Sequence, residues 1–142
     1  MHEIALRFAH IQERLRAAAL RADRRLEDVQ VLAATKWRSA NQINAAIQAG
    51  VRCIGENRVQ EAKEKIKILG RPVPWHLIGP LQTNKVKDAL VLFDLIHSVD
   101  RPSLVQELDK RARATGKRAP RLDPTPLLQQ RFESHLQALG SS

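Results

Sequence analysis

Lys36 is the residue whose type and position best suit covalent chemistry. It directly follows the apolar run 31–35 and is itself followed by Trp37 and Arg38. A lysine attacks a carbonyl carbon only as the neutral amine, and burial or a nearby cation makes that form more available. Trp37 and Arg38 are candidates for supplying these two influences. The alternative is a lysine that only marks where a strand meets water.

Three further groups of polar side chains also follow short apolar stretches. They are Glu56 and Asn57; Gln82, Asn84 and Lys85; and His97, Ser98 and Asp100. The carboxyl ends of parallel strands meet at one edge of a sheet, and ligands bind there in α/β folds. We therefore expect these groups to gather with Lys36 at one rim. The competing interpretation is that every strand simply ends in a polar loop.

Cys53, His76 and His97 each fall inside a predicted strand, which raises the question of a metal site. Their spacing matches no standard ligand pattern, so no metal is predicted. We interpret Cys53 as a core residue and the two histidines as hydrogen-bonded side chains. The sequence also lacks a glycine-rich phosphate loop of the Walker or dinucleotide type.

The elements that position these residues alternate between helix and strand. Apolar periodicity predicts a first helix at 3–22, strands at 31–35, 51–55, 75–79 and 93–99, and helices at 39–49, 59–69, 84–92 and 103–116. The first strand reads as buried on both faces. Ser39 with Gln42 and Ser103 with Gln106 have capping-box spacing. Regular strand–helix alternation predicts parallel strands joined by crossovers.

Four strand–helix units make half of an eight-stranded barrel. A complete barrel needs at least about 200 residues, and this chain has 142. We predict the α/β class, as a small open sheet or as the N-terminal half of a (β/α)8 TIM-type barrel. Its first and fourth strands would be open edges. Residues 121–126 read as a loop and not a strand, and an amphipathic helix carrying Leu128, Phe132, Leu136 and Leu139 follows.

Charge and composition limit the classes of function that the sequence supports. The net charge is +9, but the excess is spread out except for a basic block at 110–121, and there are only five aromatic residues. A solvated basic face is therefore favoured over a nucleic-acid site. The single cysteine excludes an internal disulfide and suits a reducing compartment. With no long apolar stretch and no signal-peptide core, we expect a soluble, cytoplasmic protein without membrane contact.

Four blocks of sequence resemble a known family. They are Ala34-Thr35-Lys36, Gly-Glu-Asn-Arg-Val-Gln-Glu-Ala at 55–62, Trp-His-Leu-Ile-Gly-Pro-Leu-Gln-Thr-Asn-Lys at 75–85, and Ile-His-Ser-Val-Asp-Arg at 96–101. Together they are similar to the pyridoxal phosphate homeostasis protein family (YggS/PROSC-like). The resemblance covers residues 1–118, interpreted as a partial cofactor-binding barrel domain, and leaves 119–142 as a tail of loop and helix that does not resemble the family.

The resemblance implies a barrel like the N-terminal domain of alanine racemase. It also implies that pyridoxal 5′-phosphate is held as a Schiff base on Lys36, with Asn57 and His76 near the cofactor. The family is thought to buffer or deliver the cofactor inside the cell, and no catalytic reaction is established for it. Thr35 stands where the family usually has serine, and the turn after Lys36 lacks the usual proline.

The family continues through four more strands, and its phosphate-binding residues come from that second half. We therefore expect a C-terminally shortened or divergent member with weakened phosphate anchoring, which could form a homodimer through its exposed barrel edges. Alternatives are a racemase- or transaminase-type enzyme, a basic binding module, and a remnant that binds little or no cofactor. The complete absence of tyrosine excludes a tyrosine base from this chain and lowers the enzyme interpretation.

Overall fold

The structure, a computed structural model, describes residues 2–116 and the backbone of residues 121–124. The helices are α1 (His2–Arg21), α2 (Ala40–Gln48), α3 (Val59–Leu69), α4 (Val86–Leu92) and α5 (Pro102–Thr115), with 3-10 turns at Leu26–Asp28 and Thr83–Lys85. The strands are β1 (Ala33–Ala34), β2 (Ile54–Glu56), β3 (Trp75–Leu77), β4 (Leu95–Val99) and β5 (Arg121–Pro124).

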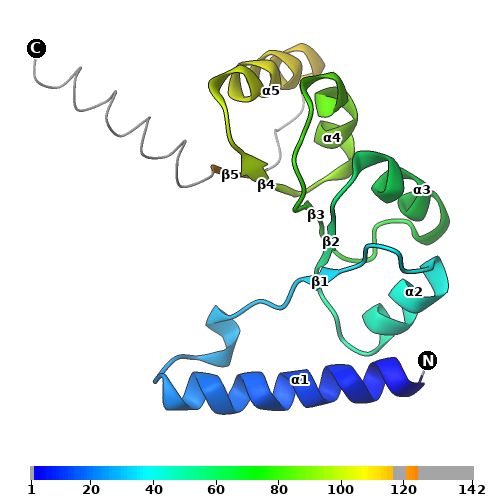
Figure 1. The fold of residues 1–142 in the computed structure, drawn as a ribbon, viewed down its shortest axis with the longest axis vertical. Coiled ribbons are helices and arrows are strands. Elements are labelled where there is room, and N and C mark those ends of the chain that lie inside the picture. The colour runs from blue at the N-terminus through cyan, green and yellow to red at the C-terminus, as the bar shows by residue number, and fades with distance from the viewer. Residues whose placement is uncertain (1, 117–120, 125–142) are drawn as a thin grey trace, which may run out of the picture.

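All five strands form one parallel sheet in the order β1-β2-β3-β4-β5. Each of the helices α2 to α5 connects two neighbouring strands, and Figure 1 shows these helices stacked side by side along one face of the sheet. The helix α1 lies apart from this layer and contacts α2. The predicted α/β class and the alternation of parallel strands with helices are therefore confirmed.

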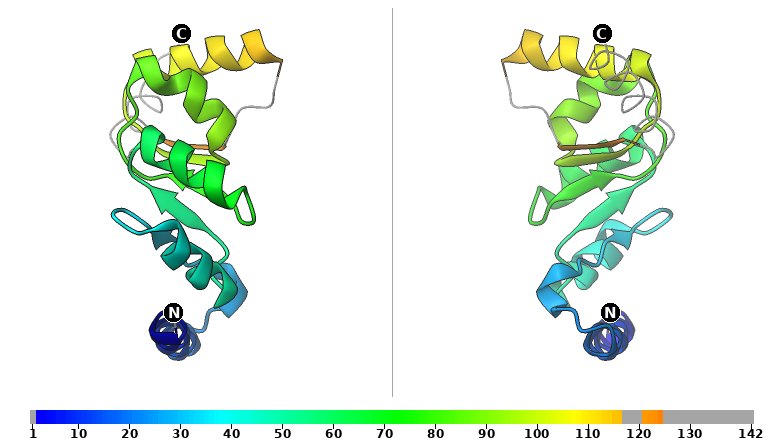
Figure 2. Two further views of the ribbon diagram at one scale, coloured as in Figure 1. Left: turned by 90° about the vertical axis from the view of Figure 1, so that its right-hand side faces the viewer. Right: turned by 90° about the vertical axis from the view of Figure 1, so that its left-hand side faces the viewer.

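The two ends of the sheet differ from the prediction. We predict residues 121–126 as a loop, yet Arg121–Pro124 pair with β4 as a fifth parallel strand (Figure 2), so β4 is not an open edge. These residues have weak strand propensity, but the unpaired backbone of β4 offers hydrogen bonds, and a proline is tolerated in an edge strand. The predicted helix after residue 126 lies outside the described residues.

The first strand is also shorter and less buried than predicted. Only Ala33 and Ala34 form β1, with Ala33 half-buried and Ala34 exposed. The prediction of a strand at 31–35 buried on both faces is wrong, because within the described ranges β1 lies at the edge of the sheet with β2 as its one neighbour. Small apolar side chains can therefore occupy it without being covered.

The core lies between the sheet and the layer of helices. Alternate strand residues point to the same face of a sheet, and Ile54, Trp75, Leu77 and Ile96 are fully buried members of this core. The intervening residues, such as Gly55 and His76, belong to the opposite face. The sheet thus separates an apolar, helix-covered layer from a second face that bears the candidate site.

The N-terminal cap of α2 agrees with the sequence prediction, and the N-terminal cap of α5 does not. The Ser39 hydroxyl accepts from the Gln42 amide, and the Gln42 side chain accepts from the Ser39 amide, so the first capping box is confirmed. The second is wrong, because α5 begins one residue earlier, with Arg101 as its N-cap and Pro102 at its first position. Proline is favoured there because its fixed φ suits the first turn.

Among the described residues, no helix combines the length and apolarity needed to cross a membrane.

The basic block is solvated where the structure describes it. Lys110, Arg111 and Arg113 are exposed on the last turns of α5. Arg111 pairs with Glu107 at 2.9 Å, and Arg113 pairs with Asp109 at 3.1 Å. These pairs come from acids one turn earlier in the helix, so part of the positive charge is locally balanced.

Cys53 gives a testable prediction. Its side chain is fully buried, and burial, with a smaller contribution from the charge of Asp94, raises the pKa of the thiol to about 11. Because the thiolate is the reactive form, we expect iodoacetamide to leave Cys53 unmodified at pH 8 in the native protein and to alkylate it in urea, as measured by mass. The native thiol keeps its proton to higher pH than an unfolded one, so the free energy of unfolding should fall as pH rises from about 9 to 11. Rapid native labelling would contradict the burial.

Candidate functional site

The register of the strands brings Lys36 and Asn57 to the same level of the sheet. Ala34 lies opposite Gly55, and Gly55 lies opposite His76. Backbone hydrogen bonds from Thr35 to Gly55 and from Ile78 to Glu56 carry this pairing past the strand ends. Two residues further along, Lys36 and Asn57 form the next row, at the carboxyl edge.

Among the predicted cofactor residues, Lys36 and Asn57 therefore follow paired strands at the same level, and His76 belongs to the row below. All three lie on the side of the sheet away from the helix layer, because they alternate with the core residues of their strands. We call this set of Lys36, Asn57 and His76 the rim site. The structure gives it one lysine, one amide and one imidazole.

Lys36 itself is exposed, so the burial considered for it on the sequence is not found among the described residues. Its ammonium group lies 5.4 Å from the centre of the Trp37 ring. Trp37 is 77% exposed, and at such a site the cation–π attraction contributes about 0.5–1 kcal/mol. The indole therefore biases the direction of the lysine side chain without excluding water from it.

The backbone at Lys36 is a tight turn. The Arg38 amide donates to the Thr35 carbonyl at 3.0 Å, which closes a four-residue turn with Lys36 and Trp37 at its centre. Trp37 has φ +63°, a left-handed conformation. This conformation costs a residue with a side chain about 1–2 kcal/mol. Interactions around the turn must offset that cost.

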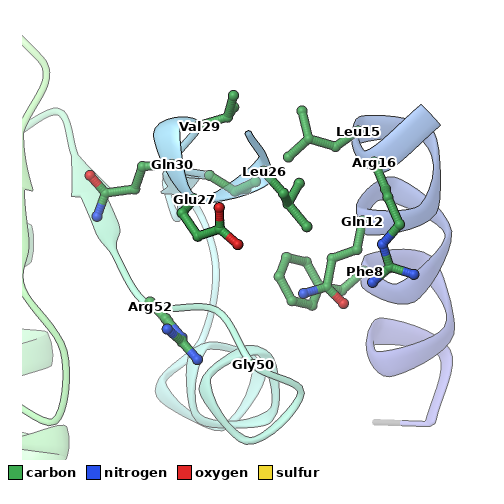
Figure 3. A pocket seen from close by; sticks show the side chains of 11 residues that line it. Phe8, Gln12, Leu15, Arg16, Leu26, Glu27, Val29, Gln30, Gly50 and Arg52 are labelled. Atoms are coloured by element: carbon green, nitrogen blue, oxygen red, sulfur yellow. The ribbon is translucent and has the colours of Figure 1, made fainter. Parts of the chain in front are cut away.

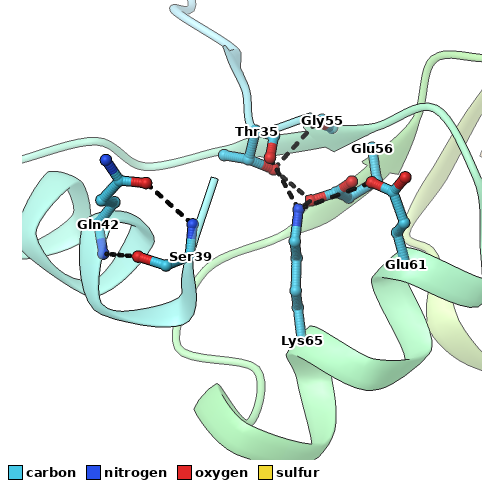
Figure 4. Close-up of polar contacts among 7 residues, drawn as sticks. All are labelled: Thr35, Ser39, Gln42, Gly55, Glu56, Glu61 and Lys65. Carbon is cyan, nitrogen blue, oxygen red and sulfur yellow. Dashed lines mark hydrogen bonds and ion pairs between the residues drawn. The ribbon is translucent and has the colours of Figure 1, made fainter. Parts of the chain in front are cut away.

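Behind the turn lies a buried ionic cluster that we call the Glu56 cluster, made of Thr35, Glu56 and Lys65 (Figure 4). The Lys65 ammonium donates to Glu56 Oε1 at 2.6 Å and to the Thr35 carbonyl at 2.7 Å. The Thr35 hydroxyl donates its one proton to Glu56 Oε1, and its oxygen lies 3.3 Å from the Gly55 carbonyl oxygen. Glu56 is fully buried, and the Lys65 side chain is 13% exposed.

The sequence did not reveal the role of Lys65. Its spacing suggests an i,i+4 pair with Glu61, yet its ammonium lies 3.9 Å from Glu61 and only 2.6 Å from Glu56. A detectable signal was present, since Glu56 directly follows a buried run and a buried carboxylate requires a partner. The register of α3 against β1 and β2 then decides which lysine is the partner.

The two histidines meet on the face that bears the rim site. His76 Nδ1 and His97 Nε2 are 3.1 Å apart, and the ring centres are 5.2 Å apart. The prediction that these histidines are hydrogen-bonded is confirmed. The contact links β3 to β4 and restrains the orientation of the His76 ring.

Gly79 allows the backbone of Asn57 to approach closely. A Cβ atom on Gly79 would lie 2.2 Å from the Asn57 carbonyl oxygen, and this contact is with backbone, which cannot move aside cheaply. Any larger residue at this position would displace Asn57. An isolated glycine at the end of a strand often marks such a close backbone approach.

The remaining predicted rim residues are not all part of one cluster. Gln82, Asn84 and Lys85 are exposed in and beside the 3-10 turn after β3. The Ser98 hydroxyl donates to the Ile78 carbonyl at 3.3 Å, and Asp100 pairs with its neighbour Arg101. These last groups support the loops at the carboxyl edge, so we do not assign them to the rim site.

A separate cleft of about 610 Å³ lies between α1, the turn after it, and the segment that enters β2 (Figure 3). Its lining includes Phe8, Leu15, Arg16 and Arg52. None of the three residues of the rim site lines this cleft. It is therefore a different feature from the candidate site.

Comparison with known proteins gives consistent relatives. No protein-family model matches the chain. The pyridoxal phosphate homeostasis protein of Escherichia coli strain K12 is 38% identical over 115 residues, which are 77% of this chain and 48% of that protein. The protein of the same name from Aquifex aeolicus is 40% identical over 107 residues, covering 75% of this chain and 47% of the relative. The chain thus spans about half the length of the curated relatives it matches.

Solved structures also resemble this one, and two of them are as follows. A protein described as unknown, from Bifidobacterium adolescentis, aligns with a TM-score of 0.77 at 40% identity, over 81% of this chain and 51% of that one. PipY of Synechococcus elongatus, solved with PLP bound, aligns with a TM-score of 0.66 at 45% identity, over 79% of this chain and 52% of that one.

The parallel strands, the helices on one face and the lysine at the end of the first strand define a partial barrel of the (β/α)8 class. Within that class, the chain is a relative of the pyridoxal phosphate homeostasis proteins, as its sequence blocks indicate.

Proposed function

We propose that this chain binds pyridoxal 5′-phosphate through Lys36 and takes part in the intracellular handling of that cofactor. The observation that carries the proposal is the placement of Lys36 and Asn57 in one row at the carboxyl edge of the sheet, with His76 on the same face. A relative at 45% identity was solved with PLP bound, which supports the choice of cofactor.

The residues of the rim site fit this cofactor in part. When bound, the cofactor supplies an aldehyde carbon, which joins a neutral amine with loss of one water molecule. Lys36 is accessible and presents the amine, and the turn at Thr35–Arg38 directs its backbone. Asn57, held by the close approach of Gly79, and His76, restrained by His97, would contact the ring of the cofactor. We assign residues 1–118 to this cofactor-binding part and 119–142 to a separate tail.

The test is the site of covalent attachment. The purified chain is mixed with one equivalent of pyridoxal 5′-phosphate and reduced with borohydride, and the modified peptides are mapped by mass. We expect one predominant adduct on Lys36 and its loss in Lys36→Ala, with circular dichroism unchanged. Lys85→Ala, which removes another exposed lysine beyond a strand end, is the matched control and should keep the Lys36 adduct. Labelling scattered over many lysines would overturn the proposal.

We also propose that two copies of the chain associate through the free edge of β1. Beside this edge lies a groove of about 380 Å³ between α1, α2 and β1, lined by apolar side chains that include Ile4, Phe8 and Ile11. Ile11 is 50% exposed, and among the residues that the structure describes β1 pairs on one side only, with β2. An edge strand of a second copy would satisfy this backbone and cover the groove. Light scattering at micromolar concentration should give twice the chain mass of 16.0 kDa, and a monomer mass would contradict the association.

A further inference from the structure

We propose that Lys65, on the helix-covered side of the sheet, is a positioning residue for Lys36 and determines its selective reaction with the aldehyde. This inference rests on the function proposed for Lys36. It arises from one contact: the Lys65 ammonium donates to the Thr35 carbonyl at 2.7 Å. That carbonyl belongs to the peptide bond that joins Thr35 to Lys36.

The Thr35 carbonyl connects the Glu56 cluster to the turn that contains Lys36. It accepts one hydrogen bond from the Lys65 ammonium and one from the Arg38 amide, which closes the turn. A carbonyl oxygen has two lone pairs, so both are used. The plane of this peptide is thereby fixed, and with it the direction in which Lys36 leaves the sheet.

The turn needs this support because it is strained. Trp37 has φ +63° in the third position of the turn, where glycine or asparagine is usual. A non-glycine residue persists in this conformation only when the surrounding structure over-determines it. Lys65 supplies a charge-assisted bond from a helix that is itself packed against the sheet, so the restraint does not depend on the exposed loop.

Lys65 is in turn held by Glu56. Glu56 is fully buried and its Oε1 atom accepts from both Lys65 and the Thr35 hydroxyl. The cluster therefore binds Thr35, the residue that follows β1, through its side chain and its backbone together. Lys65 does not have to touch the cofactor to act in this way.

The experiment removes both buried charges, so that no unpaired charge is left to unfold the protein. Three proteins are compared: the unmodified chain, the double variant Lys65→Met/Glu56→Leu, and Lys67→Met. Lys67 lies on the same helix with a side chain 63% exposed, so it is the matched control. Circular dichroism and urea unfolding establish that each protein is folded.

Two measurements report on the positioning. Hydrogen–deuterium exchange of the Arg38 amide reports on the turn without any cofactor, and we expect its protection to fall about tenfold in the double variant, as for loss of a charge-assisted bond. In the double variant, Lys36 acetylation by trace acetic anhydride should approach the pH profile of exposed Lys85. The share of reduced pyridoxyl adduct on Lys36 should likewise approach the share on Lys85. Lys67→Met should match the unmodified chain in both.

The outcomes separate this inference from the proposed function. If the folded double variant keeps the Arg38 protection, the acetylation profile and the Lys36 share of adduct, Lys65 does not position Lys36. If the unmodified chain shows no preference for Lys36, the proposed function fails and the inference, which depends on it, fails with it. Loss of Arg38 protection together with loss of the Lys36 preference in the double variant alone supports both.

Discussion

Replacing Lys65 with methionine is expected to lower the free energy of unfolding by about 3–5 kcal/mol, because it leaves a buried carboxylate without its cation. Glu56 is fully buried, and Lys65 is its ion-pair partner at 2.6 Å. A domain of this size has a total stability of about 5–15 kcal/mol, so the single variant should be only marginally folded. Urea denaturation followed by circular dichroism gives the loss directly.

The double variant Lys65→Met/Glu56→Leu should recover most of that loss. Glu56 Oε2 is buried without a hydrogen-bond partner among the described residues, and leucine removes this orphan atom together with the charge. Replacing a buried ion pair by apolar residues of similar volume is often neutral or stabilising. A double variant as unstable as Lys65→Met alone would show that the cluster stabilises the fold by packing and not by charge pairing.

Replacing Trp75 with alanine is expected to cost about 3–5 kcal/mol through the cavity it leaves. Trp75 has no exposed surface and lies in the core between the sheet and the helices. Its Nε1 atom is buried and has no partner within the part of the chain that the structure describes. An unsatisfied buried donor costs about 1–3 kcal/mol.

The matched variant Trp75→Phe tests that second statement. Phenylalanine loses part of the volume but also removes the orphan N–H, so we expect its destabilisation to stay within about 1 kcal/mol. The comparison uses urea midpoints measured by far-ultraviolet circular dichroism, because the indole fluorescence itself is changed. If phenylalanine were nearly as costly as alanine, the N–H would be making an interaction that stabilises the native state.

Periodicity and turn residues were enough to predict the order of the elements. The helix at 3–22 and the capping box at Ser39 are local features, and local features are readable in a single sequence. Gly79 was also readable, because an isolated glycine after a strand indicates a close approach. These signals placed Lys36 and Asn57 just after their strands and His76 within its strand, which agrees with the bounds of β1, β2 and β3.

The predictions that proved wrong depend on contacts between elements that are distant in the sequence. Arg121–Pro124 form a strand because β4 offers an unpaired edge, and the four residue types by themselves do not predict a strand. The exposure of β1 depends on its place at the end of the sheet. The pairing of Lys65 with Glu56 depends on how α3 packs across two strands, which sequence spacing does not encode.

The contrasting environments of the two tryptophans divide the fluorescence of the chain into two independent signals. Trp37 is 77% exposed beside Lys36, whereas Trp75 is fully enclosed. A pyridoxyl group on Lys36 absorbs where indole emits, so it would quench the red-shifted emission of Trp37 most strongly. The blue-shifted emission of Trp75 would follow the integrity of the fold. One emission spectrum can therefore separate occupancy of the lysine from unfolding of the protein.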